Sequence, residues 1–376
     1  MSIPGTTPAP RVLVAPLDWG LGHATRCVPV IRQLEAAGAT VLIAAEGAAA
    51  ALLAAEFPHV TILPLNGYRI RYARTRLALL GKLVWQIPGI LGTIRREQRW
   101  LQQVIASHSI DAVISDNRYG LYCARVPSVI ITHQLLVRTG LGKRANRLLQ
   151  RIHYRFLARF STCWVPDADG PGSLAGMLSH PRKMPPLHTR YIGVLSRLRP
   201  APPSTGGDLL VLLSGPEPQR TLLEDLVLRE LAGSGSRAVV VRGLPGTAEL
   251  RQAPPGITLI NHLPAAQLEP LLRGAAMVVA RSGYSTVMDL VTLRKKSVLI
   301  PTPGQTEQEY LATYLREQGY ALCLPQSGFS LRVALEQAAS FPYRFPEATN
   351  GAALEQAVES LLAQTKTSSQ RLAATT

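Results

Sequence analysis

Short apolar runs alternate with longer mixed segments along the first 200 residues of the chain. A strand covered on both faces reads as a continuous apolar run, whereas a helix repeats its apolar positions every three or four residues. The mixed segments at 24–37 and 141–160 have helical spacing. The apolar runs predict parallel strands at 11–15, 40–44, 60–63, 111–115, 128–132 and 162–165.

The alternation is interrupted at residues 199–207, which are rich in Pro, Ser and Gly, and then begins again. Such a composition is typical of a linker. We therefore expect an α/β protein with two Rossmann-like, doubly wound domains, 1–200 and 201–376, facing each other across a cleft. A last helix at about 351–364 is placed to pack back on the first domain. The second half predicts strands at 209–213, 238–242, 257–261, 276–280, 297–300 and 321–324.

The composition fits a folded protein, because 47% of the 376 residues are hydrophobic and 17% are charged. The four cysteines are widely scattered without a CxxC pair, which predicts reduced, mostly buried thiols in a cytoplasmic protein. Residues 1–10 lack the basic start and apolar core of a signal peptide. The chain has no run of about 18 apolar residues, so we expect no membrane-spanning helix.

The net charge of +16 belongs to the first half, because residues 1–205 hold 25 Lys and Arg against 9 Asp and Glu. Segments 69–99 and 138–159 are strongly basic, and the first encloses an apolar stretch with Trp85. This pattern favours peripheral attachment to an anionic membrane, at the inner face of the cell membrane. The alternative is a core helical hairpin at 77–94 beside a solvated basic face. Nucleic acid is disfavoured, because neither segment interleaves aromatic residues as stacking platforms.

A glycine-rich turn follows the first predicted strand. Gly20 and Gly22 permit a tight turn, and His23 lies at or near the start of the next helix. Unpaired amides at that position attract anions. A histidine there can also take a proton from an acceptor hydroxyl. The alternative is a phosphate-binding turn in which His23 only caps the helix.

Three strand ends of the second half carry similar turns. Ser214 and Gly215 follow one strand in a geometry that suits a diphosphate. Residues 281–283 follow another and open a helix on which Asp289 could hold the two ribose hydroxyls. The third turn, at 300–310, offers amide side chains to sugar hydroxyls. Each of these turns could equally be an ordinary helix start.

Together these turns resemble glycosyltransferase family 28, a MurG-like family of the GT-B superfamily. The motifs at 20–23, 214–215, 281–289 and 303–309 occur in the family's order, and 281–289 is the most specific of them. The likeness spans most of the chain. Residues 131–134 also resemble a loop of the family that contains His and Gln.

The resemblance implies a GT-B fold and a nucleotide-diphosphate sugar, a UDP-sugar, held mainly by the second domain. It also implies an acceptor site in the first domain and no metal or other cofactor. His23 would be the active-site histidine. The donor-binding residues implied by position are Ser214, Gly215, His262, Leu263, Arg281, Ser282, Gly283, Ser285, Thr286, Asp289, Gln305, Gln308 and Glu309.

Residues 116–118 end a predicted parallel strand and should therefore border the cleft. Asp116 could assist His23 as a second catalytic residue or bind the acceptor, and its alternative role is to cap a turn. The acceptor site is expected to include Gly22, Asn117, Arg118, His133 and Gln134.

Two departures from the family pattern leave the donor sugar open. Pro216 removes an amide donor from the glycine-rich phosphate turn. Leu311 stands where the family often has an amide side chain.

We expect an inverting, metal-independent hexosyltransferase that uses a UDP-sugar and a lipid or cell-envelope acceptor. One alternative is a nucleotide-sugar hydrolase with water as acceptor, because residues 22–27 also resemble the hydrolase of pseudaminic acid synthesis. Another is a non-catalytic nucleotide-sugar binder.

Overall fold

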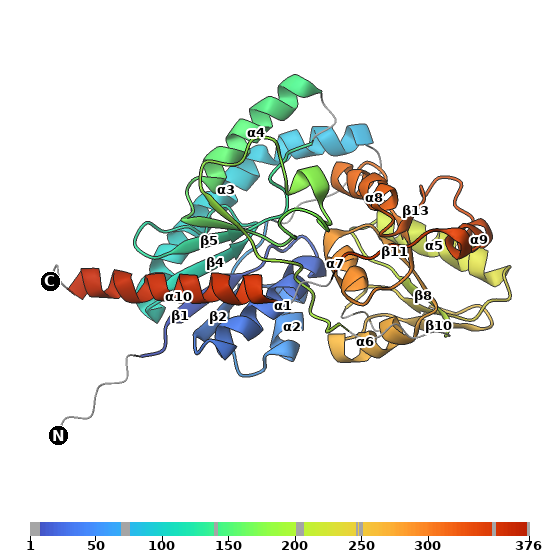
Figure 1. The fold of residues 1–376 in the computed structure, drawn as a ribbon, viewed down its shortest axis with the longest axis horizontal. Coiled ribbons are helices and arrows are strands. Elements are labelled where there is room, and N and C mark those ends of the chain that lie inside the picture. The colour runs from blue at the N-terminus through green and yellow to red at the C-terminus, as the bar shows by residue number, and fades with distance from the viewer. Residues whose placement is uncertain are drawn as a thin grey trace.

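The computed structural model describes residues 8–68, 76–138, 142–200, 207–245, 247, 251–347 and 351–373, without the side chains of 76–87 and 367–373. These residues form two parallel sheets, each flanked by helices (Figure 1). The strand orders are β3-β2-β1-β4-β5-β6-β7 and β10-β9-β8-β11-β12-β13. In each sheet the chain begins at an inner strand and reverses its direction of winding there. This reversal point is where α/β sheets bind ligands.

The first sheet contains β1 (Arg11–Ala15), β2 (Thr40–Ala45), β3 (Thr61–Pro64), β4 (Ala112–Asp116), β5 (Ser128–Ile131), β6 (Thr162–Val165) and β7 (His188–Tyr191). Its helices are α1 (Leu21–Ala36), α2 (Gly47–Glu56), α3 (Arg76–His108), α4 (Lys143–Leu157) and the short η1 (Gly176–Leu178).

The second sheet contains β8 (Leu209–Leu212), β9 (Ala238–Val241), β10 (Ile257–Ile260), β11 (Met277–Arg281), β12 (Ser297–Ile300) and β13 (Leu322–Cys323). Its helices are α5 (Gln219–Ala232), α6 (Ala265–Gly274), α7 (Tyr284–Thr292), α8 (Thr306–Gln318) and α9 (Leu331–Ser340).

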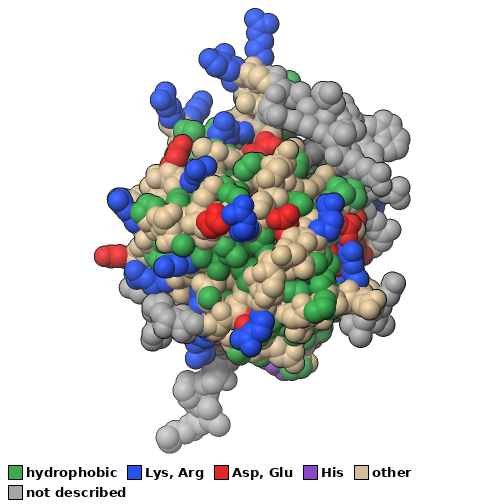
Figure 2. Space-filling model, turned by 90° about the vertical axis from the view of Figure 1, so that its right-hand side faces the viewer, with side chains coloured by type: hydrophobic (Ala, Val, Ile, Leu, Met, Phe, Trp, Pro, Cys, Tyr) green, Lys and Arg blue, Asp and Glu red, His purple; other side chains and the backbone are tan. Residues whose placement is uncertain are grey.

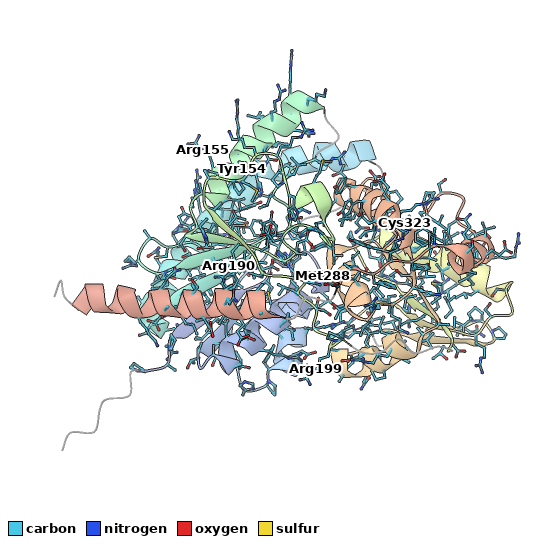
Figure 3. The ribbon with its side chains drawn as sticks, viewed as in Figure 1. Tyr154, Arg155, Arg190, Arg199, Met288 and Cys323 are labelled. Atoms are coloured by element: carbon cyan, nitrogen blue, oxygen red, sulfur yellow. The ribbon has the colours of Figure 1, made fainter. Side chains whose placement is uncertain are left out.

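A continuous apolar core joins the two sheets. It runs from the first sheet through α1 and α7 into the second, and α1 contacts α7 directly. Met288 of α7 is fully buried and lies near the centre of the molecule (Figure 3). Complete burial of a side chain of this size contributes about 1.5–3 kcal/mol. The two domains are therefore packed together along this seam.

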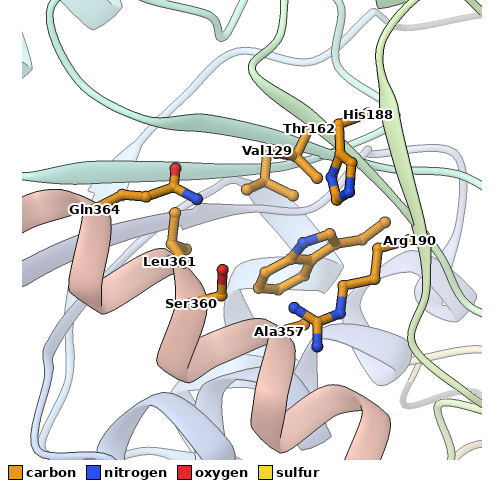
Figure 4. Close-up of a pocket in the computed structure, with 9 residues that line it drawn as sticks. Val129, Thr162, His188, Arg190, Ala357, Ser360, Leu361 and Gln364 are labelled. Carbon is orange, nitrogen blue, oxygen red and sulfur yellow. The ribbon is translucent and has the colours of Figure 1, made fainter.

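The last helix, α10 (Ala352–Ala373), returns to the first domain, where it contacts α1 and β4. Leu361 of this helix faces Val129 of β5 across a small cavity of about 30 Å³ (Figure 4). Arg190 Nη1 donates to the Gln356 carbonyl at 3.2 Å. The last helix, α10, thus packs on the domain that β1 and α1 begin.

The GT-B arrangement of two Rossmann-like sheets is confirmed, and twelve predicted strands lie within a residue or two of the observed ones. β7 is an additional strand that the sequence pattern does not predict. It lies at the sheet edge and is only half-buried, so it lacks the apolar run of a strand covered on both faces. The predicted linker falls largely on 201–206, outside the described residues.

The basic segment at 69–99 is described only in part, because 69–75 and the side chains of 76–87 lie outside the description. From Arg76 to His108 the backbone is a single helix that contains Pro88, so the hairpin alternative at 77–94 is wrong. Within the described part of the chain, every helix is too short or too polar to cross a bilayer. The four cysteines are free and buried.

Candidate active site

The sheet topology brings His23 and Asp116 together. β1 pairs in parallel with β4, so the two strands end at the same edge of the sheet. α1 begins just beyond β1, after Gly20, whose φ of 113° is a backbone conformation that favours glycine. His23 lies in the first turn of α1, and Asp116 is the last residue of β4. The predicted pairing of these side chains is thus what the fold produces.

A buried ion pair holds His23 in place. Asp116 Oδ2 lies 2.9 Å from His23 Nδ1. Arg26, one helical turn further along α1, donates through Nε to both Asp116 oxygens at 2.9 Å and also through Nη2 to Asp116 Oδ1. Arg26 and Asp116 are 2% and 0% exposed, so water scarcely screens their attraction. Arg26 is absent from the sequence-based expectations, although its i, i+3 spacing from His23 places both on one face of α1.

The surroundings of His23 favour its neutral form. Burial lowers the pKa of His23 below its ordinary value of 6.5, and Arg26 lowers it further, while Asp116 opposes both. Burial alone would raise the pKa of Asp116, but Arg26 and His23 hold it below its ordinary value. At neutral pH an uncharged ring therefore faces an ionised carboxylate. When Nδ1–H donates to Asp116, Nε2 keeps the lone pair that a general base needs.

Asn117 joins the same cluster from the end of β4. Its backbone adopts a φ of 57°, which is uncommon outside glycine and aids a sharp turn at the strand end. In the orientation that satisfies its neighbours, its side-chain amide donates to Thr132 Oγ1 at 2.8 Å and accepts from Arg26 Nη2 at 3.0 Å. Asn117 therefore braces the arginine that holds Asp116.

Glu307 of α8 reaches this cluster from the second domain. Its Oε1 lies 2.8 Å from His133 Nε2, and its Oε2 accepts from Gln134 Nε2. The other ring nitrogen of His133 lies 3.4 Å from Arg26 Nη1. The His133 ring also stacks on Tyr284 of α7, with centroids 4.0 Å apart. His133 and Gln134, predicted at the acceptor site, are thus adjacent to His23's cluster and bound across the domain interface.

Neither Glu307 nor Tyr284 is among the sequence-predicted residues. Both lie inside motifs whose neighbouring residues are predicted, at 303–309 and 281–289. The available signal is position: each lies in the first turn of a helix that follows a buried strand, where side chains meet the opposite domain.

The two domains touch where α1 and α7 begin. Ser285 Oγ of α7 donates to the Gly22 carbonyl at 2.8 Å. A Cβ on Gly22 would stand 2.9 Å from this oxygen, so a glycine permits the close approach. Among the described side chains, none caps the start of α7 at Gly283. Thr286, which is half-buried, follows in the same turn. The His23 turn and the 281–289 block therefore meet where the two domains touch.

The turn between β12 and α8 is braced by its own side chains. Gln305 is the N-cap residue of α8. Gln308 Oε1 accepts from the Thr302 amide at 2.9 Å, and Glu309 Oε1 accepts from the Gly304 amide at 2.9 Å. The side chains of Gln308 and Glu309 therefore fix the shape of the turn, and their role toward a donor sugar stays a prediction.

Two other predicted donor residues are engaged within the protein. Ser282 is fully buried and donates to the Gln308 carbonyl at 3.1 Å. Asp289 accepts from Ser196 Oγ at 2.6 Å, and its other oxygen lies 3.8 Å from Arg197 Nε. Burial raises the pKa of Asp289, and Arg197 opposes this shift. The carboxylate expected to hold the ribose thus binds the segment that leads out of the first domain.

The remaining predicted residues lie at the same edge of the second sheet. Ser214 is exposed at the end of β8, and Gly215 has a φ of 101°. His262 and Leu263 are half-buried beyond β10. Burial lowers the pKa of His262, and the nearby Arg197 lowers it further. Their positions are compatible with a nucleotide at this edge.

Two arginines of the predicted site are engaged inside their own domains. Arg118 is buried, and its Nε donates to Oε1 of Glu97 in α3 at 2.7 Å. Arg281 is also buried, where it donates to Gln326 Oε1 at 2.7 Å and to the Gln219 carbonyl at 2.7 Å. Burial lowers the pKa of Arg281 to about 10. Both guanidiniums bind acceptors inside their own domain, and their roles toward a ligand stay predictions.

Sequence comparison finds relatives among glycosyltransferases. Residues 261–365 match the Glycosyltransferase family 28 C-terminal domain. The UDP-N-acetylglucosamine--N-acetylmuramyl-(pentapeptide) pyrophosphoryl-undecaprenol N-acetylglucosamine transferase of Xylella fastidiosa is 29% identical over 271 residues, or 69% of this chain and 68% of that protein. An uncharacterized glycosyltransferase of Methanosarcina mazei is 21% identical over 340 residues, or 84% of this chain and 86% of that protein.

Solved structures share the fold at low identity. The glycotransferase of kitacinnamycin has a TM-score of 0.61 and 16% identity, with 96% of each chain covered. The Acinetobacter baumannii MurG structure has a TM-score of 0.51 and 16% identity, with 96% of this chain and 97% of that chain covered. With its two Rossmann-like domains and a second domain that matches the C-terminal domain of glycosyltransferase family 28, the chain is a glycosyltransferase that is similar to MurG-like members of that family.

Proposed function

We propose that this glycosyltransferase moves a hexosyl group from a UDP-sugar to a hydroxyl of a lipid-linked or cell-envelope acceptor, with inversion and without a metal. The observation that carries the proposal is the contact between Ser285 and Gly22, which sets the turn of His23 beside the start of α7. Uncapped amides at a helix start bind phosphate groups. A donor diphosphate at α7 would then present its sugar towards His23.

The chemistry follows from this placement. The acceptor hydroxyl attacks the anomeric carbon, and its proton passes to Nε2 of His23 as the new carbon–oxygen bond forms. The bond to the diphosphate oxygen breaks, and the electron pair leaves with the diphosphate. The positive end of the α7 dipole stabilises the departing charge. A single displacement of this kind inverts the anomeric centre.

The donor contacts would come from the second domain. The amides at 283–285 and the hydroxyls of Ser285 and Thr286 suit the diphosphate, while Ser214 and Gly215 suit its other side. The walls close again on the bound donor for the transfer, but because Ser285 touches Gly22 in the described arrangement, a donor sugar enters only after they move apart. The same movement would free Asp289 from Ser196 for the ribose.

A lipid acceptor is supported by a relative and by a surface. The Xylella fastidiosa relative acts on a pyrophosphoryl-undecaprenol acceptor, as its name states. On α4 of this chain, Leu148 and Ile152 are 59% and 41% exposed among basic residues. Figure 2 shows Lys and Arg side chains projecting at the top of the molecule, where Figure 1 places α4. The exposed basic residues of α4 are Lys143, Arg144, Arg147, Arg151 and Arg155.

An interfacial site of this kind suits an anionic bilayer, because apolar side chains enter the headgroup region while the arginines meet lipid phosphates. Each basic residue near such a surface contributes about 1 kcal/mol. We therefore propose that the protein binds peripherally, at the inner face of the cell membrane.

The test begins with a panel of UDP-sugars screened for protection against thermal unfolding, because a ligand that binds only the folded state raises its stability. The protective sugar is then incubated with membrane lipid extract, with and without EDTA. The proposal expects a glycosylated lipid of inverted configuration in both cases. Free sugar released without lipid would instead favour the hydrolase, and binding without turnover would favour the non-catalytic binder.

A further inference from the structure

Glu307 binds residues of the opposite domain, which a role in holding the donor sugar does not explain. It lies in the turn expected to face the donor sugar, yet both of its carboxylate oxygens contact the opposite domain, at His133 and Gln134. Burial alone would raise the pKa of Glu307, but His133, Arg26 and His23 together hold it below the ordinary value. The second domain thus presents an ionised carboxylate to the cluster around His23.

This contact determines the proton arrangement of His133. A carboxylate oxygen only accepts, so His133 Nε2, 2.8 Å from Glu307 Oε1, must carry a proton. The Nδ1 of a neutral ring then has a lone pair, which points at Arg26 Nη1 at 3.4 Å. The opposite tautomer would set two N–H donors against each other. The ring also stacks on Tyr284, with the two planes 14° apart, which favours this ring plane.

Arg26 transmits this arrangement to His23. A guanidinium is a rigid planar fork, so placing Nη1 at His133 also fixes the direction of Nη2 and Nε. His23 Nδ1 has two competing neighbours at 2.9 Å, Arg26 Nη2 and Asp116 Oδ2. If Nδ1 donates to Asp116, Nε2 is free to act as a base. If Nδ1 accepts from Arg26, Nε2 carries the proton and the ring cannot take another there.

We propose that Glu307 is a positioning residue for glycosyl transfer, which fixes the tautomer of His133 across the domain interface and, through Arg26, selects the base form of His23. This inference rests on the proposed role of His23. It also couples chemistry to domain closure, since the carboxylate belongs to α8 and the base to α1. When the domains open, Glu307 leaves His133, and the base form of His23 is no longer selected.

Three variants test the proposal. Glu307→Ala removes the acceptor for His133, so we expect kcat to fall about tenfold or more, with a smaller change in donor KM. Glu307→Gln keeps an oxygen for His133 Nε2–H, so it should retain most of the turnover. Glu317→Ala removes a carboxylate from an exposed position of the same helix and should change neither constant.

The pH profile provides a second readout. The charged and titratable groups that face His23 are Arg26 of α1, Asp116 of β4 and Glu307 of α8, with His133 reached through Arg26. Because the charge of Glu307 raises the pKa of His23, both Glu307→Ala and Glu307→Gln should move the acidic limb of kcat/KM to lower pH. Equal losses of kcat in the two variants with an unmoved acidic limb would overturn the proposal.

A third readout needs no substrate. Nitrogen-15 spectra of labelled histidine rings distinguish a protonated from an unprotonated Nε2. We expect unprotonated Nε2 at His23 in the wild-type protein and a shift toward protonated Nε2 in Glu307→Ala, with thermal unfolding confirming that the variant is folded. An unchanged His23 tautomer would contradict the role of Glu307 alone, whereas absence of transfer by the wild-type protein would contradict the proposed function.

Discussion

The two walls of the site are built in different ways. On the first-domain wall, charged side chains bind one another: Asp116 holds His23 and Arg26, and Asn117 braces the arginine. On the second-domain wall, polar side chains turn back to the backbone, as Gln308 does to the Thr302 amide. The first wall therefore fixes the proton affinity of a side chain. The second fixes the shape of turns whose amides can meet a diphosphate.

This difference separates the expected effects of substitution. Changes in the first wall should lower kcat and, because its charges are buried, should also destabilise the fold. Changes in the second wall should act mainly on the KM of the donor, because they relax a turn without removing a reacting group.

The largest effect is expected for Asp116→Asn in the first wall. It leaves the buried charge of Arg26 uncompensated, which costs about 3–5 kcal/mol of unfolding free energy. The new amide could donate to His23 Nδ1 and select the wrong tautomer, so kcat should fall roughly 10³- to 10⁴-fold. Denaturant unfolding and steady-state kinetics measure the two effects.

The matched control is Asp225→Asn, which breaks the exposed pair with Arg251, where Oδ1 and Nη1 lie 2.6 Å apart. Exposed pairs contribute about 0–1 kcal/mol, so little should change. If the two variants lost the same stability, the Arg26–Asp116 pair would not have the importance that its burial indicates.

The next largest effect is a loss of stability in acid, caused by His153, a buried histidine beside Gln134 in the first domain. Its Nε2 lies 2.9 Å from the Gln134 carbonyl, its Nδ1 lies 2.9 Å from Tyr119 Oη, and burial lowers its pKa from 6.5 to about 4. Between these values the unfolded chain binds the proton and the folded protein does not. Unfolding free energy should therefore fall by about 3 kcal/mol as pH drops from about 6.5 to about 4.

Thermal or denaturant unfolding across this pH range measures the loss. His153→Gln can keep both hydrogen bonds without a titrating ring, so its stability should depend less on pH. An identical pH dependence in both proteins would show that another group is responsible.

The sequence predicts the fold well because buried parallel strands leave a strong local signal. Apolar runs mark the strands covered on both faces, and β7 escapes because an edge strand with residues such as His188 and Arg190 has no such run. The continuity of α3 through Pro88 is also invisible locally, since a proline usually interrupts a helix.

The site is only partly predictable, for a different reason. Glycine turns and strand ends locate His23, Asp116 and the 281–289 block, because the topology alone brings these together. Which polar side chain then meets which partner depends on tertiary packing. Arg118 and Arg281 stand at strand ends like ligand-binding arginines, yet both find acceptors inside their own domain. Glu307, by contrast, lies in a turn predicted to face the donor sugar and binds two residues of the opposite domain.

A moderate effect is expected for Gln308→Ala in the second wall. The Thr302 amide would lose its acceptor, which costs about 1–3 kcal/mol. We expect donor KM to rise roughly tenfold while kcat changes less. Gln318→Ala, at the exposed end of the same helix, is the control and should leave KM unchanged. A loss confined to kcat would contradict the separation between the walls.

The smallest effect is expected for Ser285→Ala, which removes the hydrogen bond to the Gly22 carbonyl. One such bond contributes about 1 kcal/mol, so donor KM should rise several-fold through loss of a phosphate contact and a looser closed state. Ser340→Ala, at the exposed end of α9, controls for the exchange itself. A lower donor KM would indicate instead that this bond holds the site shut against the donor.

The sharpest separation of the two walls is obtained from His23→Ala, with kcat and the Kd for the protective UDP-sugar measured on the same preparation. We expect kcat to fall roughly 10²- to 10⁴-fold, because the group that accepts the hydroxyl proton is gone, and the Kd to stay nearly constant. Retained turnover, or a Kd that weakens in step with kcat, would show that His23 is not the base of this glycosyltransferase.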